Sequence, residues 1–198
     1  MTELPDPQDR SQPWCGNEPA YLAHYKARSR KEDFPNDWRE LVYAYSHSIP
    51  TVDALKLLAT LSPLVELGAG TAYWARLLKD LGTDIVAYDL VSAESNDWTA
   101  KLPAWTELRP GDACTALRQH PDRVPFACWP PRPDGYMSDV FRIYRGTTIA
   151  LITDGRFLGE GDHRDPLYDA LESEWTLDQR VELPNWPYRQ DSLMIWRR

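Results

Sequence analysis

The chain is short of cysteine, and this shortage excludes two kinds of stabilising framework. Its 198 residues include 3 cysteines, which are Cys15, Cys114 and Cys128. An odd and scattered set without Cys-x-x-Cys spacing predicts neither a disulfide framework nor a zinc site. We therefore expect no bound metal and a reducing, cytoplasmic compartment.

Positive charge is also in short supply. Lys and Arg number 22 against 30 Asp and Glu, which gives a net charge of −8. A protein that holds a nucleic-acid backbone needs an excess of Lys and Arg to neutralise phosphates. The balance therefore predicts a small-molecule partner and no nucleic acid. No apolar run approaches the length that spans a bilayer, so no membrane partner is expected either.

The length predicts one domain of ordinary size with three segments. Residues 1–13 are polar and rich in Pro and Asp, and we expect them to be disordered. Residues 14–49 are rich in aromatic side chains and should form a helical lid across the mouth of the body. Residues 50–198 should form the body itself.

The stretch from residue 63 to residue 89 predicts a strand, a tight turn, a helix and a second strand. The apolar run 64–67 ends in the closely spaced Gly68 and Gly70, and the segment after them has a helical apolar period. The next apolar run, 85–88, ends in Asp89, 19 residues after Gly70. Glycines let a backbone approach a ligand closely, and a carboxylate at a strand tip can accept hydrogen bonds from ribose hydroxyls. The unit therefore suits a cofactor that contains a nucleoside.

The glycine spacing favours one cofactor over another. A dinucleotide turn requires Gly-x-Gly-x-x-Gly, and its third glycine place is occupied here by Tyr73. Spaced instead as acid-x-Gly-x-Gly-x-Gly, the segment supplies Glu66, Gly68 and Gly70, with Ala72 in the third glycine place. This pattern resembles motif I of the class I methyltransferases that depend on S-adenosylmethionine (SAM).

The end of the chain agrees with this resemblance. Two short runs, 179–184 and 192–196, are joined by a segment too short for a helical crossover, so they should pair antiparallel. The resemblance implies the α/β, Rossmann-like class I methyltransferase fold, with a seven-stranded, mostly parallel sheet and an antiparallel last strand. Together the motifs Val-Glu-Leu-Gly-Ala-Gly-Thr-Ala-Tyr-Trp-Ala, Cys-Trp-Pro-Pro and Pro-Asn-Trp-Pro are similar to a set of uncharacterised bacterial and fungal methyltransferase-like proteins.

Two further strand tips complete the expected cofactor site. Asp112 follows a short strand and suits two compatible roles, as a helix N-cap and, by the resemblance, as a partner of the adenine amine. Trp129 stands where amino-methyltransferases of bases have Asn or Asp before Pro-Pro, so it cannot clamp an amine. It can wall the cofactor, stack on a flat or cationic group, or pack in the core. The residues that the resemblance assigns to SAM are Glu66, Gly68, Ala69, Gly70, Asp89, Leu90, Asp112, Ala113 and Trp129.

The candidate catalytic residues lie just before the body. Tyr43, Tyr45 and His47 alternate along the chain and should face Trp129 across an enclosed pocket that also takes in part of the loop 154–161. His47 is the candidate base for an oxygen acceptor, since its ordinary pKa is near neutral, and a purely structural histidine is the competing interpretation. Either tyrosine could orient the acceptor.

The function expected from these residues is SAM-dependent methyl transfer to a small molecule by in-line displacement. Two alternatives stay open: a SAM-binding partner or regulatory module without transferase activity, and a SAM-using enzyme of elimination or cyclisation. An oxidoreductase that uses a nicotinamide cofactor is disfavoured by Tyr73 in the glycine turn.

Overall fold

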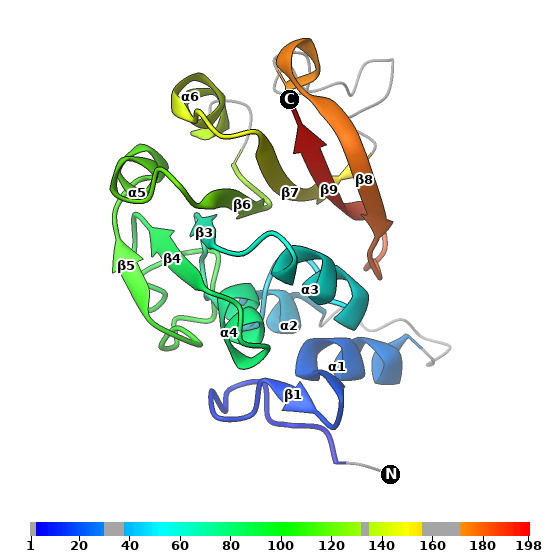
Figure 1. Cartoon of the computed structure of the whole chain (residues 1–198). Coiled ribbons are helices and arrows are strands. Elements are labelled where there is room, and N and C mark those ends of the chain that lie inside the picture. The colour runs from blue at the N-terminus through cyan, green and yellow to red at the C-terminus, as the bar shows by residue number, and fades with distance from the viewer. Residues whose placement is uncertain (1–2, 30–37, 132–134, 156–170) are drawn as a thin grey trace.

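The computed structural model describes residues 3–29, 38–131, 135–155 and 171–198. Its centre is a seven-stranded sheet with the strand order β5-β4-β3-β6-β7-β9-β8 (Figure 1). A separate two-stranded hairpin lies near the N-terminus. The strands of the large sheet are β3 (Leu64–Leu67), β4 (Ile85–Asp89), β5 (Leu108–Pro110), β6 (Val124–Cys128), β7 (Thr148–Asp154), β8 (Thr176–Glu182) and β9 (Asp191–Arg197), and the hairpin consists of β1 (Trp14–Cys15) and β2 (Glu18–Pro19).

The strand directions confirm the expected sheet. The five strands from β5 to β7 run parallel, whereas β9 is antiparallel to both β7 and β8. The reversal follows from the short connection 183–190, which leaves no room for a helix between β8 and β9. The order also reverses beside β3, because the chain proceeds from β3 to β4 on one side and returns to β6 on the other. Open sheets of this kind bind ligands at such a point, outside the carboxyl ends of the strands.

Alternation along the strands divides the core into two layers. Leu64 of β3 packs with the helices on one face of the sheet, and its neighbours Val65 and Leu67 pack with those on the other. All residues of β3 are buried, as expected for a parallel strand covered on both faces. The first layer contains α1 (Ala20–Arg28), α2 (Trp38–Ala44), α3 (Val52–Ala59) and α4 (Tyr73–Asp80), and the second contains α5 (Ala113–Gln119) and α6 (Met137–Ile143) (Figure 1).

Two of the described helices, α3 and α5, begin with a side-chain cap. The Thr51 side chain accepts a hydrogen bond from the Ala54 N–H at 3.2 Å, and the Asp112 side chain does the same for the Thr115 N–H at 2.7 Å. The described helices are short, and none of them combines the length and the apolar character needed to cross a membrane.

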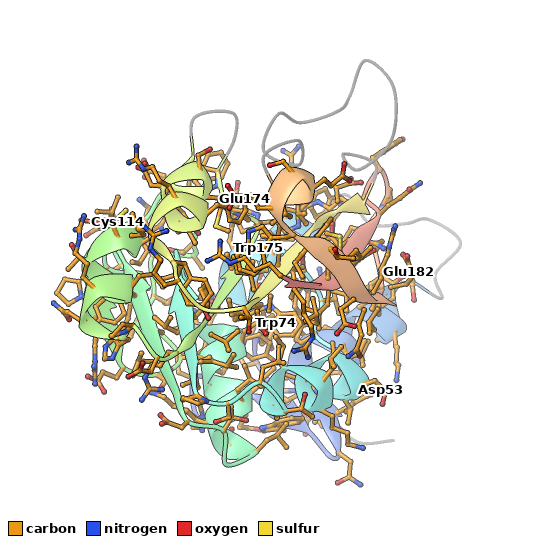
Figure 2. All side chains as sticks on the ribbon, turned by 45° about the horizontal axis from the view of Figure 1, so that its top comes forward. Asp53, Trp74, Cys114, Glu174, Trp175 and Glu182 are labelled. Carbon is orange, nitrogen blue, oxygen red and sulfur yellow. The ribbon has the colours of Figure 1, made fainter. Side chains whose placement is uncertain are left out.

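The first layer is centred on a buried tryptophan. Figure 2 shows Trp74 of α4 in the interior, while Asp53 and Cys114 lie near the outside of the molecule. Trp74 is 1% exposed, meets the Phe126 ring edge-on at 5.8 Å between centroids, and donates its indole N–H to the Ser46 hydroxyl at 3.0 Å. This hydrogen bond ties the segment after α2 to α4.

The segment 14–49 packs against the rest of the chain through aromatic side chains, and its role as a lid stays a prediction. It contains α1 and α2, as expected, together with the hairpin of β1 and β2. Tyr21 of α1 is fully buried, stacks on Tyr45 at 5.1 Å and accepts a hydrogen bond from the Trp186 indole at 2.8 Å. Aromatic side chains bury large areas and stabilise a core wherever they can stack. Their abundance here therefore serves packing.

Residues 3–13 also lie against the body, in contrast to the disorder predicted from their composition. The Arg10 guanidinium donates to the Ala44 and Pro103 carbonyls at 2.8 and 3.0 Å and lies 4.5 Å from the centre of the Trp105 ring. The Pro5 carbonyl lies 2.7 Å from the His24 Nε2. Compositional rules count apolar residues and miss a single cation placed over an indole face.

Candidate functional site

A cleft of about 700 Å³ opens at the carboxyl ends of the parallel strands. Its walls come from the loops after β3, β4, β5 and β6 and from the segment after α2. His47 and every residue predicted to contact a cofactor line this cleft. These cofactor candidates are Glu66, Gly68, Ala69, Gly70, Asp89, Leu90, Asp112, Ala113 and Trp129.

The glycine loop after β3 needs glycine for two different reasons. Gly68 and Gly70 adopt φ values of +66° and +56°, which L side chains rarely accept. A Cβ on Gly68 would also lie 2.6 Å from the Tyr136 hydroxyl oxygen. That hydroxyl donates to the Leu67 carbonyl at 2.7 Å and so cannot easily move. A Cβ on Gly70 would meet nothing within 4 Å, so this glycine leaves its backbone accessible from the cleft.

Asp89 at the tip of β4 is held in place by backbone donors. Its Oδ2 accepts from the Gly70 N–H at 2.8 Å and its Oδ1 from the Val91 N–H at 3.0 Å. The carboxylate therefore joins the glycine loop to the next strand. Each oxygen still has acceptor capacity, because an ionised carboxylate offers about four lone-pair sites. A diol in the cleft could use the remaining sites.

Glu66 places a second carboxyl group at the base of the same loop. It is 1% exposed and accepts a hydrogen bond from the Ala75 N–H at 3.2 Å. Burial raises the pKa of Glu66 to about 8, although the Ala75 N–H opposes the shift, and the negative charge of Asp89 adds to it. The group is therefore largely a neutral acid at pH 7.

This buried acid predicts a pH dependence of stability. The ordinary pKa of the group is 4.5, so between that value and about 8 the unfolded chain has lost a proton that the folded chain retains. The free energy of unfolding must then fall as the pH rises. From about pH 6.5 to about pH 8 we expect wild type to lose up to about 2 kcal/mol relative to Glu66→Gln. Urea unfolding across this range measures the difference.

A matched substitution separates burial from charge in that experiment. Glu107 has a side chain that is 65% exposed, so Glu107→Gln should leave the pH slope of wild type unchanged. Parallel slopes for wild type and Glu66→Gln would show that Glu66 is ionised in the folded protein.

Asp112 is confirmed as the N-cap of α5. One of its carboxylate oxygens accepts from the Thr115 N–H and the other from the Thr115 hydroxyl at 2.9 Å. The side chain is exposed at the wall of the cleft, and the neighbouring Ala113 is buried beneath it. The structure thus shows the capping role, and the adenine contact stays a prediction.

The opposite end of the cleft is formed around Trp129. Its backbone has a positive φ of 54°, unusual for a bulky residue. Its indole N–H donates at 3.1 Å to the Oδ2 of Asp191, which also accepts from the Ser48 hydroxyl at 2.7 Å. Asp191 is 2% exposed, and burial raises its pKa. One buried carboxylate therefore fixes the orientation of the indole.

His47 lies beside this indole. Its ring centroid is 6.4 Å from that of Trp129 and 6.2 Å from that of Trp98. Burial, and then the positive charge of Arg189, lower the pKa of His47 to about 4. The imidazole is therefore neutral at physiological pH and can accept a proton, although its low basicity makes it a weak base.

The two tyrosines predicted to join His47 do not reach the cleft. Tyr45 is fully buried and stacks on Tyr21 and on Trp105, at 5.1 and 5.3 Å between centroids. Tyr43 packs against the same core cluster. The alternating pattern assumed an extended chain, but α2 continues to Ala44, so the side chains diverge. The structure therefore does not bring these tyrosines to the acceptor end of the cleft.

The loop predicted to complete the acceptor pocket lies mostly outside the described residues. Of the range 154–161, Asp154 and Gly155 are described, and neither lines the cleft. Among the described residues, no group of three or more His, Cys, Asp or Glu side chains is placed to hold a metal ion.

The sequence analysis missed several residues of the cleft, among them Trp98, Tyr136 and Arg189. Trp98 follows β4 on a loop that shows no periodic pattern, and Tyr136 precedes α6. Arg189 belongs to the connection between β8 and β9. The Pro-Asn-Trp-Pro motif two residues before Arg189 was the available signal, and it was used only for the resemblance.

No protein-family model matches the chain, and no curated protein matches it significantly. Similar solved structures include precorrin-6y C5,15-methyltransferase from Geobacter metallireducens, with 14% identity, 75% of this chain and 87% of that chain covered, and a TM-score of 0.45. Magnesium protoporphyrin IX methyltransferase from Synechocystis with bound SAM is 11% identical, with 74% of this chain and 76% of that chain covered and a TM-score of 0.45. The M1A22 tRNA methyltransferase of B. subtilis is 12% identical, with 73% of this chain and 64% of that chain covered and a TM-score of 0.44.

The strand order with its reversed last strand decides the fold. The fold is that of the class I methyltransferases. The predicted fold class is thereby confirmed, and the identities of these neighbours are too low to carry a substrate over.

The comparisons correct one prediction. The acidic balance of the chain was taken to exclude nucleic acid, yet a tRNA methyltransferase is among the proteins of similar fold. Net charge sums over the whole surface, whereas a nucleic acid meets one face of it. The exclusion of nucleic acid as a partner is therefore wrong.

Proposed function

We propose that the chain is a SAM-dependent methyltransferase that acts on a small molecule. The observation that carries the proposal is the bond between the Asp89 carboxylate and the Gly70 N–H, at 2.8 Å, on the wall of a cleft at the carboxyl ends of the strands. This contact joins the glycine loop and the strand-tip acid into one surface. Such a surface suits the ribose and the amino-acid part of SAM.

The residues present fit that cofactor. Asp89 would accept from the ribose hydroxyls, Leu90 and Ala113 would contact the adenine, and Gly68 to Gly70 would lie beneath the amino-acid part. Glu66 suits a nearby ammonium, since a positive charge would favour the ionised form of this raised-pKa acid. When bound, SAM supplies a methyl group on a sulfonium.

The other end of the cleft would hold the acceptor. Trp129 and His47 form a wall that can orient a flat acceptor and exclude water, and positioning supplies much of the rate of an in-line displacement. For an oxygen acceptor, the neutral His47 imidazole is the proposed base. The acceptor is proposed to be small because aromatic side chains, including Trp98, occupy this end.

Thermal unfolding with added ligand tests the cofactor assignment. We expect S-adenosylhomocysteine to raise the melting temperature and NAD to leave it unchanged, because Tyr73 occupies the third glycine place of a dinucleotide turn. A ligand that binds only the folded state adds about 2.7 kcal/mol at a hundredfold excess over its Kd. Stabilisation by NAD and none by S-adenosylhomocysteine would overturn the assignment.

Labelled SAM then tests the acceptor. The protein is incubated with methyl-labelled SAM and either a metabolite extract or bulk tRNA, and the label is followed by chromatography. Label in a small molecule, with S-adenosylhomocysteine as coproduct, supports the proposal. Label in the tRNA would refute the small acceptor, and methylthioadenosine as product would indicate elimination or cyclisation.

A further inference from the structure

Arg189 occupies an unusual position at the acceptor end of the cleft. Its guanidinium carbon lies 4.6 Å from the centre of the Trp129 ring and 5.4 Å from that of Trp38. Its Nη1 donates to the His47 carbonyl at 2.6 Å. The side chain is half-buried and lines the cleft. These contacts hold a positive charge at a defined place beside His47 and Trp129.

The charge of Arg189 contrasts with the rest of the cleft. Among the described lining residues it is the one Lys or Arg, whereas Asp89 and Asp112 line the cofactor end. Within the described ranges, no carboxylate oxygen forms an ion pair with Arg189. Burial raises the pKa of Asp191 although the positive charge of Arg189 opposes the shift, and its Oδ2 already accepts from Ser48 and Trp129. The positive charge therefore has spare capacity for an outside anion.

The geometry of a guanidinium defines what that anion should be. The group carries five N–H donors in a plane, and the His47 carbonyl uses one of them. Two indole rings lie near the guanidinium, with their centres 5.4 and 4.6 Å from its carbon, and its remaining donors lie along the edge of the planar group. A planar edge of this kind binds carboxylate or phosphate oxygens in pairs.

The same position disfavours the cationic acceptor that was one prediction for Trp129. A cation would have to stack on the indole, and Arg189 already lies over that ring. Two positive charges on one ring would repel each other. The Arg189 guanidinium thus already occupies the cation position on the Trp129 indole.

We propose that Arg189 binds the anionic group, a carboxylate or a phosphate, of a flat methyl acceptor. This inference rests on the proposed function and adds a substrate class to it. The aromatic side chains of Trp129, His47 and Trp98 flank the flat part of the acceptor, and the Arg189 edge takes its charge. Arg189 is then a specificity-determining residue.

Small aromatic probes test the proposal on the intact protein saturated with S-adenosylhomocysteine. The probes are benzoate, phenyl phosphate and the neutral benzamide, and ligand-observed NMR titration gives each Kd. Wild type should bind at least one anionic probe roughly tenfold or more tightly than benzamide, because a charge-assisted hydrogen bond is lost in the amide. Arg189→Gln should abolish the preference, whereas Arg142→Gln, at a 76% exposed side chain outside the cleft, should keep it.

The outcomes separate this inference from the proposed function. The tighter anionic probe tells carboxylate from phosphate. Equal binding of benzoate, phenyl phosphate and benzamide by wild type, or an anion preference that survives in Arg189→Gln, overturns the inference. Displacement of the anionic probe by S-adenosylhomocysteine also overturns it, since the site would then belong to the cofactor.

If S-adenosylhomocysteine does not bind, the proposed function fails, and titration without it still reads out the anion preference. Should Arg189→Gln not fold, Arg189→Lys replaces it as the test variant. Arg189→Lys keeps the charge but should prefer the anionic probe over benzamide less strongly than wild type does.

Discussion

Asp89→Ala should lower the affinity for S-adenosylhomocysteine by about 10- to 150-fold. Hydrogen bonds to a charged group contribute roughly 1.5–3 kcal/mol, which corresponds to this range of Kd. The substitution also frees the Gly70 and Val91 N–H groups that Asp89 now accepts from, so the glycine loop loses its attachment to β4. Isothermal titration calorimetry measures the loss.

Two variants control this experiment. Asp89→Asn keeps the size of the side chain and one acceptor oxygen, and its affinity should fall between those of wild type and Asp89→Ala. Asp97→Ala removes a carboxylate on the loop after β4, where the Asp97 side chain is 90% exposed. Its affinity for S-adenosylhomocysteine should equal that of wild type. An unchanged Kd for Asp89→Ala would show that this acid is only a turn residue.

Gly68→Ala should lower the free energy of unfolding by about 2–5 kcal/mol. The left-handed backbone at φ +66° costs an L residue roughly 1–2 kcal/mol, and the contact of its Cβ with the Tyr136 hydroxyl adds an overpacking cost of about 1–3 kcal/mol. Urea unfolding monitored by tryptophan fluorescence measures the change.

Gly70→Ala provides the matched control for the Gly68 experiment. It has a similar backbone at φ +56° but no atom within 4 Å of the new Cβ, so only the backbone cost of about 1–2 kcal/mol should appear. Tyr136→Phe removes the hydroxyl that the Cβ would meet. It should therefore lower the free energy of unfolding less in the Gly68→Ala variant than in wild type. Equal destabilisation by the two glycine substitutions would show that the loop moves away from Tyr136.

The cofactor end was predictable because its residues follow one another along the chain. Gly68, Asp89 and Asp112 each stand at the end of a strand, and parallel strands bring these ends to one edge of the sheet. Local rules therefore placed every predicted cofactor residue on the same cleft. The capping role of Asp112 is equally local, since its partner is Thr115.

The acceptor end was not predictable in this way. Tyr45 was misplaced because the alternation assumed an extended chain, whereas α2 continues to Ala44, and helix ends are poorly defined by sequence. Arg189 was missed because its partner His47 lies 142 residues away, and no spacing rule links such positions. Only the tertiary structure brings them together.

The carboxylate of Asp191 has a consequence for redesign of this protein. Ser48, Trp129 and Asp191 come from three distant parts of the chain and meet at one oxygen atom. The cofactor end, by contrast, is encoded almost continuously from Glu66 to Ala113. Exchange of that continuous piece between homologous proteins would carry its cofactor contacts as a unit. A new acceptor preference would require coordinated changes in all three segments, because replacing one of them leaves a buried polar partner of the others unsatisfied.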